Sequence, residues 1–106
     1  MPIINLRHKY QIRYKYYKGF VRIYIDCYKE GGRYAIVLED KHGERIAVAS
    51  VNLPEYQFIG DNNVFLKGWS ENEGLPEALE KLGVVKLSGR KVPTGFCFAQ
   101  EAKIQI

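Results

Sequence analysis

A strict alternation of side chains near the N-terminus constrains the fold more than any other feature. Across residues 4–16, the even positions are aliphatic or aromatic except for His8, and the odd positions are polar or cationic. A repeat of two residues is typical of a β-strand that buries one face and exposes the other. The chain is therefore expected to begin with a long, half-buried strand that has at most one break, near His8.

The next segments predict that this strand joins an antiparallel sheet. Residues 20–28 alternate again, residues 33–39 are apolar on both faces in their middle, and residues 44–51 form a further candidate strand. The turns between them, 29–32 and 40–43, contain glycines that supply the positive φ angles of a hairpin. Three strands joined by two short turns predict a meander, with 33–39 as a central strand.

Residues 73–82 form the one convincing helix in the sequence. Its buried stripe, spaced i, i+3, i+4 and i+7, consists of Leu75, Ala78, Leu79 and Leu82. Ser70 begins a capping-box pattern, but Pro76 would then lie in the second turn and remove a backbone hydrogen bond. We therefore expect Asn72 to cap the helix and Gly83 to end it.

The rest of the C-terminal half is expected to return to the sheet. Residues 64–67 and 84–85 are predicted as short strands, 88–91 and 93–95 as polar turns, and 96–106 as the last strand. We expect a single α+β domain over residues 1–106, a twisted antiparallel β-sheet of five to seven strands with one packed α-helix. This sheet is expected either to stay open or to curl towards a barrel.

Composition and cysteine use favour a cytoplasmic protein. No apolar run approaches the roughly 18 residues that span a bilayer, and the N-terminus lacks the pattern of a signal peptide. We therefore expect no membrane partner. Cys27 and Cys97 lie far apart in apolar, strand-like segments, so we expect reduced, buried thiols, with a disulfide as the alternative.

The sequence offers little for catalysis. Its two histidines and two cysteines lack the spacing of metal ligands, and it has no Gly-rich phosphate loop, so we expect no metal and no cofactor. Cys97 is the candidate nucleophile, with His8 as a partner across the sheet, but nothing in the local sequence favours its thiolate form. We therefore expect a protein that is not an enzyme. An enzyme that uses Cys97 is the third alternative, after a protein-binding and a nucleic-acid-binding protein.

Basic residues are concentrated in the first third of the chain. Residues 1–29 contain seven lysines or arginines and one acid, whereas residues 30–106 contain nine basic and eleven acidic residues. Aligned cations repel one another, so they need water, salt, acidic neighbours or an anionic partner. The candidate residues for an anionic partner are Arg7, Lys9, Arg13, Lys15, Lys18 and Arg22.

Three interpretations of these cations are open. They can bind the phosphates of nucleic acid, protect an edge strand against aggregation, or pair with the acids of the helix. We favour the last two, because Tyr10, Tyr14 and Tyr16 are expected in the core, whereas stacking on bases needs rings beside the charges. The other tyrosines available for stacking are Tyr17, Tyr24 and Tyr28.

Several motifs resemble a small family of bacterial proteins of about this length. They are Val51–Asn52–Leu53–Pro54, Asn72–Glu73–Gly74 leading into Leu79 and Gly83, Ser88–Gly89–Arg90, and Val92–Pro93–Thr94–Gly95–Phe96–Cys97. The resemblance covers roughly residues 34–104 and not the basic N-terminal strand. This family is a domain of unknown function found in gut-bacterial genomes, phages, plasmids and conjugative elements. The resemblance implies a cytoplasmic accessory protein of mobile-element origin and assigns no site residue.

Taken together, these features predict a small binding or accessory protein. We expect its partner to be another protein, because an exposed strand edge is a natural docking surface. The alternative is a nucleic-acid-binding protein that uses the basic N-terminal strand.

Overall fold

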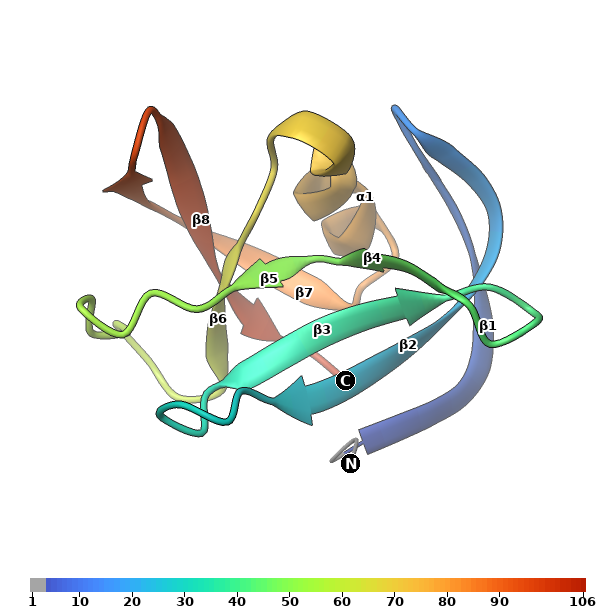
Figure 1. The fold of residues 1–106 in the computed structure, drawn as a ribbon, viewed down its shortest axis with the longest axis horizontal. Coiled ribbons are helices and arrows are strands. Elements are labelled where there is room, and N and C mark those ends of the chain that lie inside the picture. The colour runs from blue at the N-terminus through green and yellow to red at the C-terminus, as the bar shows by residue number, and fades with distance from the viewer. Residues whose placement is uncertain (1–3) are drawn as a thin grey trace.

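Within residues 4–106, eight strands form two four-stranded antiparallel sheets (Figure 1). This computed structural model describes the backbone of residues 4–106 and the side chains from residue 9 onward. The first sheet has the order β1 (Ile4–Tyr14), β2 (Tyr17–Cys27), β3 (Tyr34–Glu39) and β4 (Arg45–Val48). The second has the order β5 (Ser50–Val51), β6 (Asn63–Leu66), β8 (Cys97–Ile104) and β7 (Val85–Thr94). Between β6 and β7 lie a 3-10 turn, η1 (Ser70–Asn72), and the helix α1 (Leu75–Lys81).

The two sheets meet at Ala49, the residue that separates β4 from β5. The Ala49 amide donates to the Ile36 carbonyl of the first sheet, and the Ala49 carbonyl accepts from the Lys67 amide beside β6. The predicted strand 44–51 is therefore one segment that serves both sheets. At the other side, α1 lies between the edge strands β1 and β7 (Figure 1). The sheets thus do not close into a barrel. The predicted number of strands, five to seven, was too low, because the described residues form eight.

The predicted meander is confirmed, whereas the first strand is continuous from Ile4 to Tyr14 and shows only an irregular register near His8. β2, β3 and β4 pair consecutively and antiparallel. In the pairing of β1 with β2, the register shifts between Asn5 and Lys9. The core lies on the inner faces of the sheets. It includes Ile12, Val21, Ile23, Ile36, Leu38, Val64 and Leu66, all almost fully buried.

The helix is shorter than predicted, and its predicted cap is wrong. It begins at Leu75, after Gly74, whose φ of 84° redirects the chain, and no side chain caps it. Pro76 lies in the first turn, where its missing N–H costs no hydrogen bond. Asn72 is instead buried, and its Nδ2 donates to the Val48 carbonyl at 2.8 Å. Gly83 follows the helix with a φ of 79°, as predicted.

The segment 88–91 is not a turn between strands. It belongs to β7, where Leu87 pairs with Ala102 and Lys91 pairs with Gln100. Three residues, 88–90, therefore lie opposite Glu101 alone, in a β-bulge whose Gly89 has a φ of 87°. A glycine flanked by polar residues is typical of both a turn and a bulge, so the sequence does not separate them.

No helix within the described residues is long and apolar enough to cross a membrane.

Leu79→Ala is expected to lower the free energy of unfolding by about 2–5 kcal/mol, because it leaves a cavity in the core. Leu79 has no exposed surface and packs in the main core cluster. Urea unfolding measures the change, with Lys81→Ala on the exposed side of the same helix as the control, expected within about 0.5 kcal/mol of the parent. An unchanged unfolding midpoint for Leu79→Ala would contradict the packing of α1 described above.

Candidate functional site

Two pairs of cations flank an exposed phenylalanine, Phe20, on the outer face of β1 and β2. On the side away from β1, Phe20 borders a pocket that Tyr17, Asp40, Lys41 and His42 also line. In the pairing of β1 with β2, Lys9 lies opposite Arg22, Arg13 lies opposite Lys18, and Gln11 lies opposite Phe20 between the two cation pairs. Residues directly opposite in an antiparallel pair share a face of the sheet. All six are exposed, and 56% of Phe20 is accessible to solvent. We call Lys9, Arg13, Lys18, Arg22 and Phe20 the cationic face.

The cationic face is not neutralised within the described part of the chain. Among the described side chains, Lys9, Arg13, Lys18 and Arg22 form no ion pair. Arg22 also lies opposite Glu39 of β3, without an ion pair between them. Four exposed positive charges therefore lie close together, and Glu39 opposite Arg22 is the one acid that the strand register places beside them among the described residues.

Lys15 has a different environment from these four. It lies in the turn between β1 and β2, and its Nζ is 3.1 Å from a carboxylate oxygen of Glu73, just before α1. The hydrogen bond and the charge of Glu73 raise the pKa of Lys15. Pairing with helix-end acids thus accounts for Lys15 alone among the predicted cations whose side chains are described. The side chain of Arg7, the other predicted residue, lies outside the described part.

Edge protection explains only part of the cationic face. β1 is an edge strand of the first sheet, so Lys9 and Arg13 can serve to discourage pairing with another chain. β2 pairs with β3 only from Arg22 to Cys27, so Lys18 lies in the part of β2 that pairs with β1 alone, whereas Arg22 has a strand on both sides. A doubly paired position has no open edge to protect, so Arg22 needs another explanation.

The aromatic residue of this face is Phe20, which the sequence analysis did not single out. Phe20 is two residues from both Lys18 and Arg22, so the alternation along β2 already places it on the same face as these cations. Tyr10 and Tyr14 pack against the core as predicted. Tyr16 was expected there too, but it lies in the turn after β1 and is 59% exposed. The three tyrosines proposed for stacking, Tyr17, Tyr24 and Tyr28, are half-buried.

A groove continues the cationic face towards the helix. It has a volume of about 420 Å³ and lies where β1 and β2 meet α1. Its lining includes Arg13, Lys18 and Lys81, together with the apolar side chains of Ala78 and Leu82. Lys81, in the last turn of α1, thus adds a third positive charge beside one of the cation pairs.

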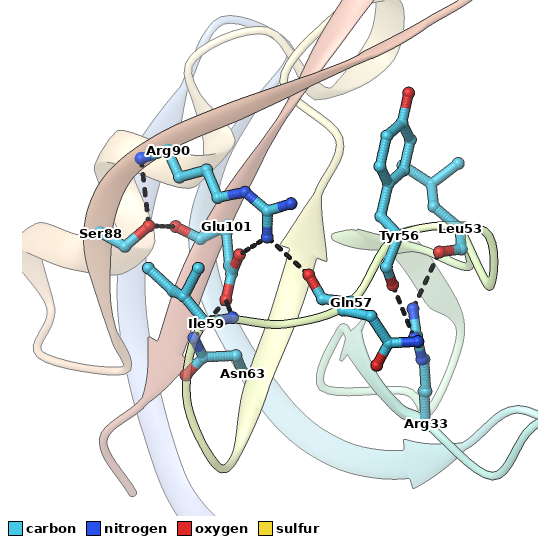
Figure 2. A network of polar contacts seen from close by, with 9 residues as sticks. All are labelled: Arg33, Leu53, Tyr56, Gln57, Ile59, Asn63, Ser88, Arg90 and Glu101. Carbon is cyan, nitrogen blue, oxygen red and sulfur yellow. Dashed lines mark hydrogen bonds and ion pairs between the residues drawn. The ribbon is translucent and has the colours of Figure 1, made fainter.

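A second polar cluster surrounds the buried carboxylate of Glu101 in the other sheet (Figure 2). Glu101 has no exposed surface, and Arg90, from the bulge of β7, donates to its Oε1 at 2.5 Å. The amide of Ile59 and the Nδ2 of Asn63 donate to its Oε2. The same guanidinium donates to the Gln57 carbonyl, so Arg90 links β8 to the loop 52–62.

Arg33 holds the other half of this loop. Its guanidinium donates to the carbonyls of Leu53 and Tyr56 (Figure 2). The same group lies over the ring of Phe58, 4.4 Å from its centre. Arg33, just before β3, and Arg90, in β7, therefore satisfy three carbonyl groups of an irregular segment that has few ladder partners of its own.

Glu101 is suited to a structural role and not to proton transfer. Burial raises the pKa of its carboxyl group, but the hydrogen bonds from Asn63, from the Ile59 amide and from Arg90 lower it by more. The net pKa lies below the ordinary value, so the group is ionised and holds no proton to donate. Because it is fully buried and accepts three hydrogen bonds, a substrate cannot reach it without breaking the network.

The predicted cysteines are free and half-buried, so neither lies fully in the core as expected. Cys97 pairs with Thr94 at the end of the β7–β8 hairpin. The side chain of His8, its suggested partner, lies outside the described residues. Within the part of the chain searched, no three His, Cys, Asp or Glu side chains gather in a way that could hold a metal ion.

Comparison with protein-family models, with curated proteins and with solved structures gave no match.

Glu101→Gln is expected to lower the free energy of unfolding at neutral pH by about 2 kcal/mol, because it weakens hydrogen bonds to a charged group. A carboxyl whose pKa is lower in the folded state stabilises the fold above its unfolded pKa, and this contribution is lost as the pH falls through the folded pKa. The difference between parent and variant should therefore be constant above about pH 5 and shrink below the ordinary value of 4.5. Urea unfolding across this pH range measures it.

The matched control is Glu55→Gln, an exposed carboxylate in the loop that the network holds. It is expected to have little effect on the unfolding midpoint at any of these pH values. A Glu101→Gln protein as stable as the parent at neutral pH would show that the network does not hold the loop.

Proposed function

We propose that this domain binds nucleic acid through the cationic face of β1 and β2. The observation that carries the proposal is that two pairs of exposed cations lie directly opposite one another on the face of β1 and β2 and form no ion pair among the described side chains. One of them, Arg22, is flanked by strands on both sides, where edge protection does not explain it. Phosphate groups would supply the missing negative charge, with release of the counterions that surround a nucleic acid.

The arrangement of the cations supports a ligand with repeated negative charges. Like charges directly opposite in a sheet are destabilising, and the cationic face contains two such pairs, Lys9 with Arg22 and Arg13 with Lys18. A single small anion would relieve one pair, whereas a chain of phosphates can relieve both. The third cation in the groove, Lys81, extends this positive region to the helix.

The proposal describes a cytoplasmic binding domain that performs no catalysis and needs no cofactor. The resemblance of residues 34–104 to accessory proteins of mobile elements would suit such a role, although it assigns no residue. It does not extend to the basic N-terminal strand, so the cationic face supports the proposal independently of it.

Replacing both members of one cation pair, Arg13→Gln with Lys18→Gln, is expected to weaken binding to nucleic acid. Each lost phosphate contact should reduce the slope of log K against log salt by about 0.7–0.9, so two lost contacts should reduce it by up to about 1.8. Fluorescence anisotropy of a labelled oligonucleotide over a range of salt concentrations gives both the affinity and the slope.

The chain provides a closely matched control. Lys86 and Lys103 also lie directly opposite one another and exposed, on β7 and β8 of the other sheet. The double change Lys86→Gln with Lys103→Gln removes the same charge and should leave the slope unchanged. If both double variants lose the same affinity and slope, the effect comes from net charge and not from the cationic face. If the parent protein binds no nucleic acid at low salt, the proposed function is refuted.

A protein partner is the second candidate, and a separate surface favours it. Phe96 lies in the two-residue turn of the β7–β8 hairpin with its side chain completely exposed. Exposed aromatic residues at protruding positions are common anchors in protein interfaces. This surface belongs to the second sheet, whereas the cationic face belongs to the first.

Phe96→Ser is expected to abolish capture of a protein partner while leaving the fold unchanged, because the side chain contacts solvent alone. An affinity pull-down from the source cell, quantified by mass spectrometry, compares the variant with the parent and with Ile59→Ser, another exposed apolar position. A protein captured equally by all three would argue against the hairpin as an interface.

A further inference from the structure

We infer that the ligand of the cationic face is single-stranded, and that one of its bases stacks on Phe20 between phosphates held by the two cation pairs. This inference rests on the proposed function and adds the class of nucleic acid and the residue that selects it. It is carried by the position of an exposed aromatic side chain between two pairs of cations that form no ion pair within the described residues.

The first step in the argument is the cost of exposing Phe20. A phenylalanine with 56% of its surface in water leaves much of its apolar area unburied, whereas β2 alternates between buried and exposed positions with few other apolar exceptions. Charged or polar residues would serve solubility better at this position, among four cations. An aromatic ring there is explained by a ligand that offers an apolar surface next to negative charge.

The second step is the chemistry of that ligand. A nucleotide combines a flat base, which stacks on an aromatic ring, with phosphates on either side that bind lysine and arginine. Lys9 and Arg13 are four residues apart along β1, or about 13 Å at the usual rise per residue. A base on Phe20 therefore has cations on both sides of it along the strand direction.

The third step excludes a duplex. In a double helix the faces of each base are covered by the bases above and below, so a ring standing on a sheet can reach only phosphates and groove edges. Contact with phosphates would leave Phe20 without an apolar partner. In a single strand the bases can be splayed and their faces are accessible, as in other sheet surfaces that bind single strands.

The groove beside α1 indicates where the strand continues. Arg13 and Lys18 belong to the cationic face and also line this groove. Lys81, from α1, lines the groove as well. A phosphate that follows the stacked base can lie among these three cations. The apolar lining of Ala78 and Leu82 gives the adjoining sugar or base a surface to contact.

The test compares Phe20→Ala with Phe98→Ala, which removes an equally exposed phenylalanine from β8 of the other sheet. The probes are labelled single-stranded DNA and RNA of about 12 nucleotides, within the usual site sizes for single strands, the corresponding duplex, and heparin. Phe20→Ala should weaken single-strand binding by about ten-fold, as expected for loss of one stacking contact. Heparin binding and the salt slope should stay the same, because the phosphate-binding cations remain. Comparison of the affinities for single-stranded DNA and RNA shows whether deoxyribose or ribose is preferred.

Phe20→Trp provides a positive readout. The chain has a single tryptophan, Trp69, whose signal in the parent protein gives the background. Stacking of a base on the new indole should quench its fluorescence on addition of single strand and not on addition of heparin, with affinity kept near that of the parent.

The outcomes separate this inference from the proposed function. If no nucleic acid binds at low salt, the proposed function fails and the inference with it. If nucleic acid binds but the duplex binds as tightly as the single strand, the inference alone is overturned. It is likewise overturned if Phe20→Ala, shown to be folded by circular dichroism, binds as the parent does or loses no more affinity than Phe98→Ala.

Discussion

The two sheets share one corner and leave a gap on the opposite side, and the rest of the fold depends on how that gap is filled. Ala49 joins the sheets at the corner through hydrogen bonds to both. On the open side, α1 inserts Leu75 and Leu79, neither of which has any exposed surface. Without the helix, the inner faces of both edge strands would be in water, and burial of apolar area is the main force that holds such layers together.

This arrangement also supports the cationic face. Ile12 and Val21 lie on the inner side of the β1–β2 hairpin and are almost fully buried in the same core as the helix. Repulsion between two pairs of opposed cations costs the hairpin stability, and burial of these residues offsets that cost. A strand pair anchored in this way can keep unpaired charges on its outer face, because its inner face does not depend on them.

Local periodicity made the first half of the fold predictable, and long-range contacts explain the errors in the second half. The alternation from residue 4 and the glycine turns at 29–32 and 40–43 depend on neighbouring residues. The structure confirms a strand over residues 4–14, with alternating burial among its described side chains 9–14, and both turns. The role of Asn72 depends on the carbonyl of Val48 in another strand, which local spacing does not reveal. The bulge at 88–90 depends in the same way on the buried Glu101 opposite it, so the segment was predicted as a turn.

The candidate site shows the same division between local and long-range information. The cations on β1 were evident from alternation, but their relation to Lys18 and Arg22 required the register of the hairpin. That register places Phe20 between the two cation pairs, and the strand order places β2 inside the sheet. Edge protection was a sufficient explanation while the cations were considered one strand at a time. It does not explain Arg22, which the register places between β1 and β3, and the proposal of an anionic ligand rests on this residue together with the two opposed cation pairs.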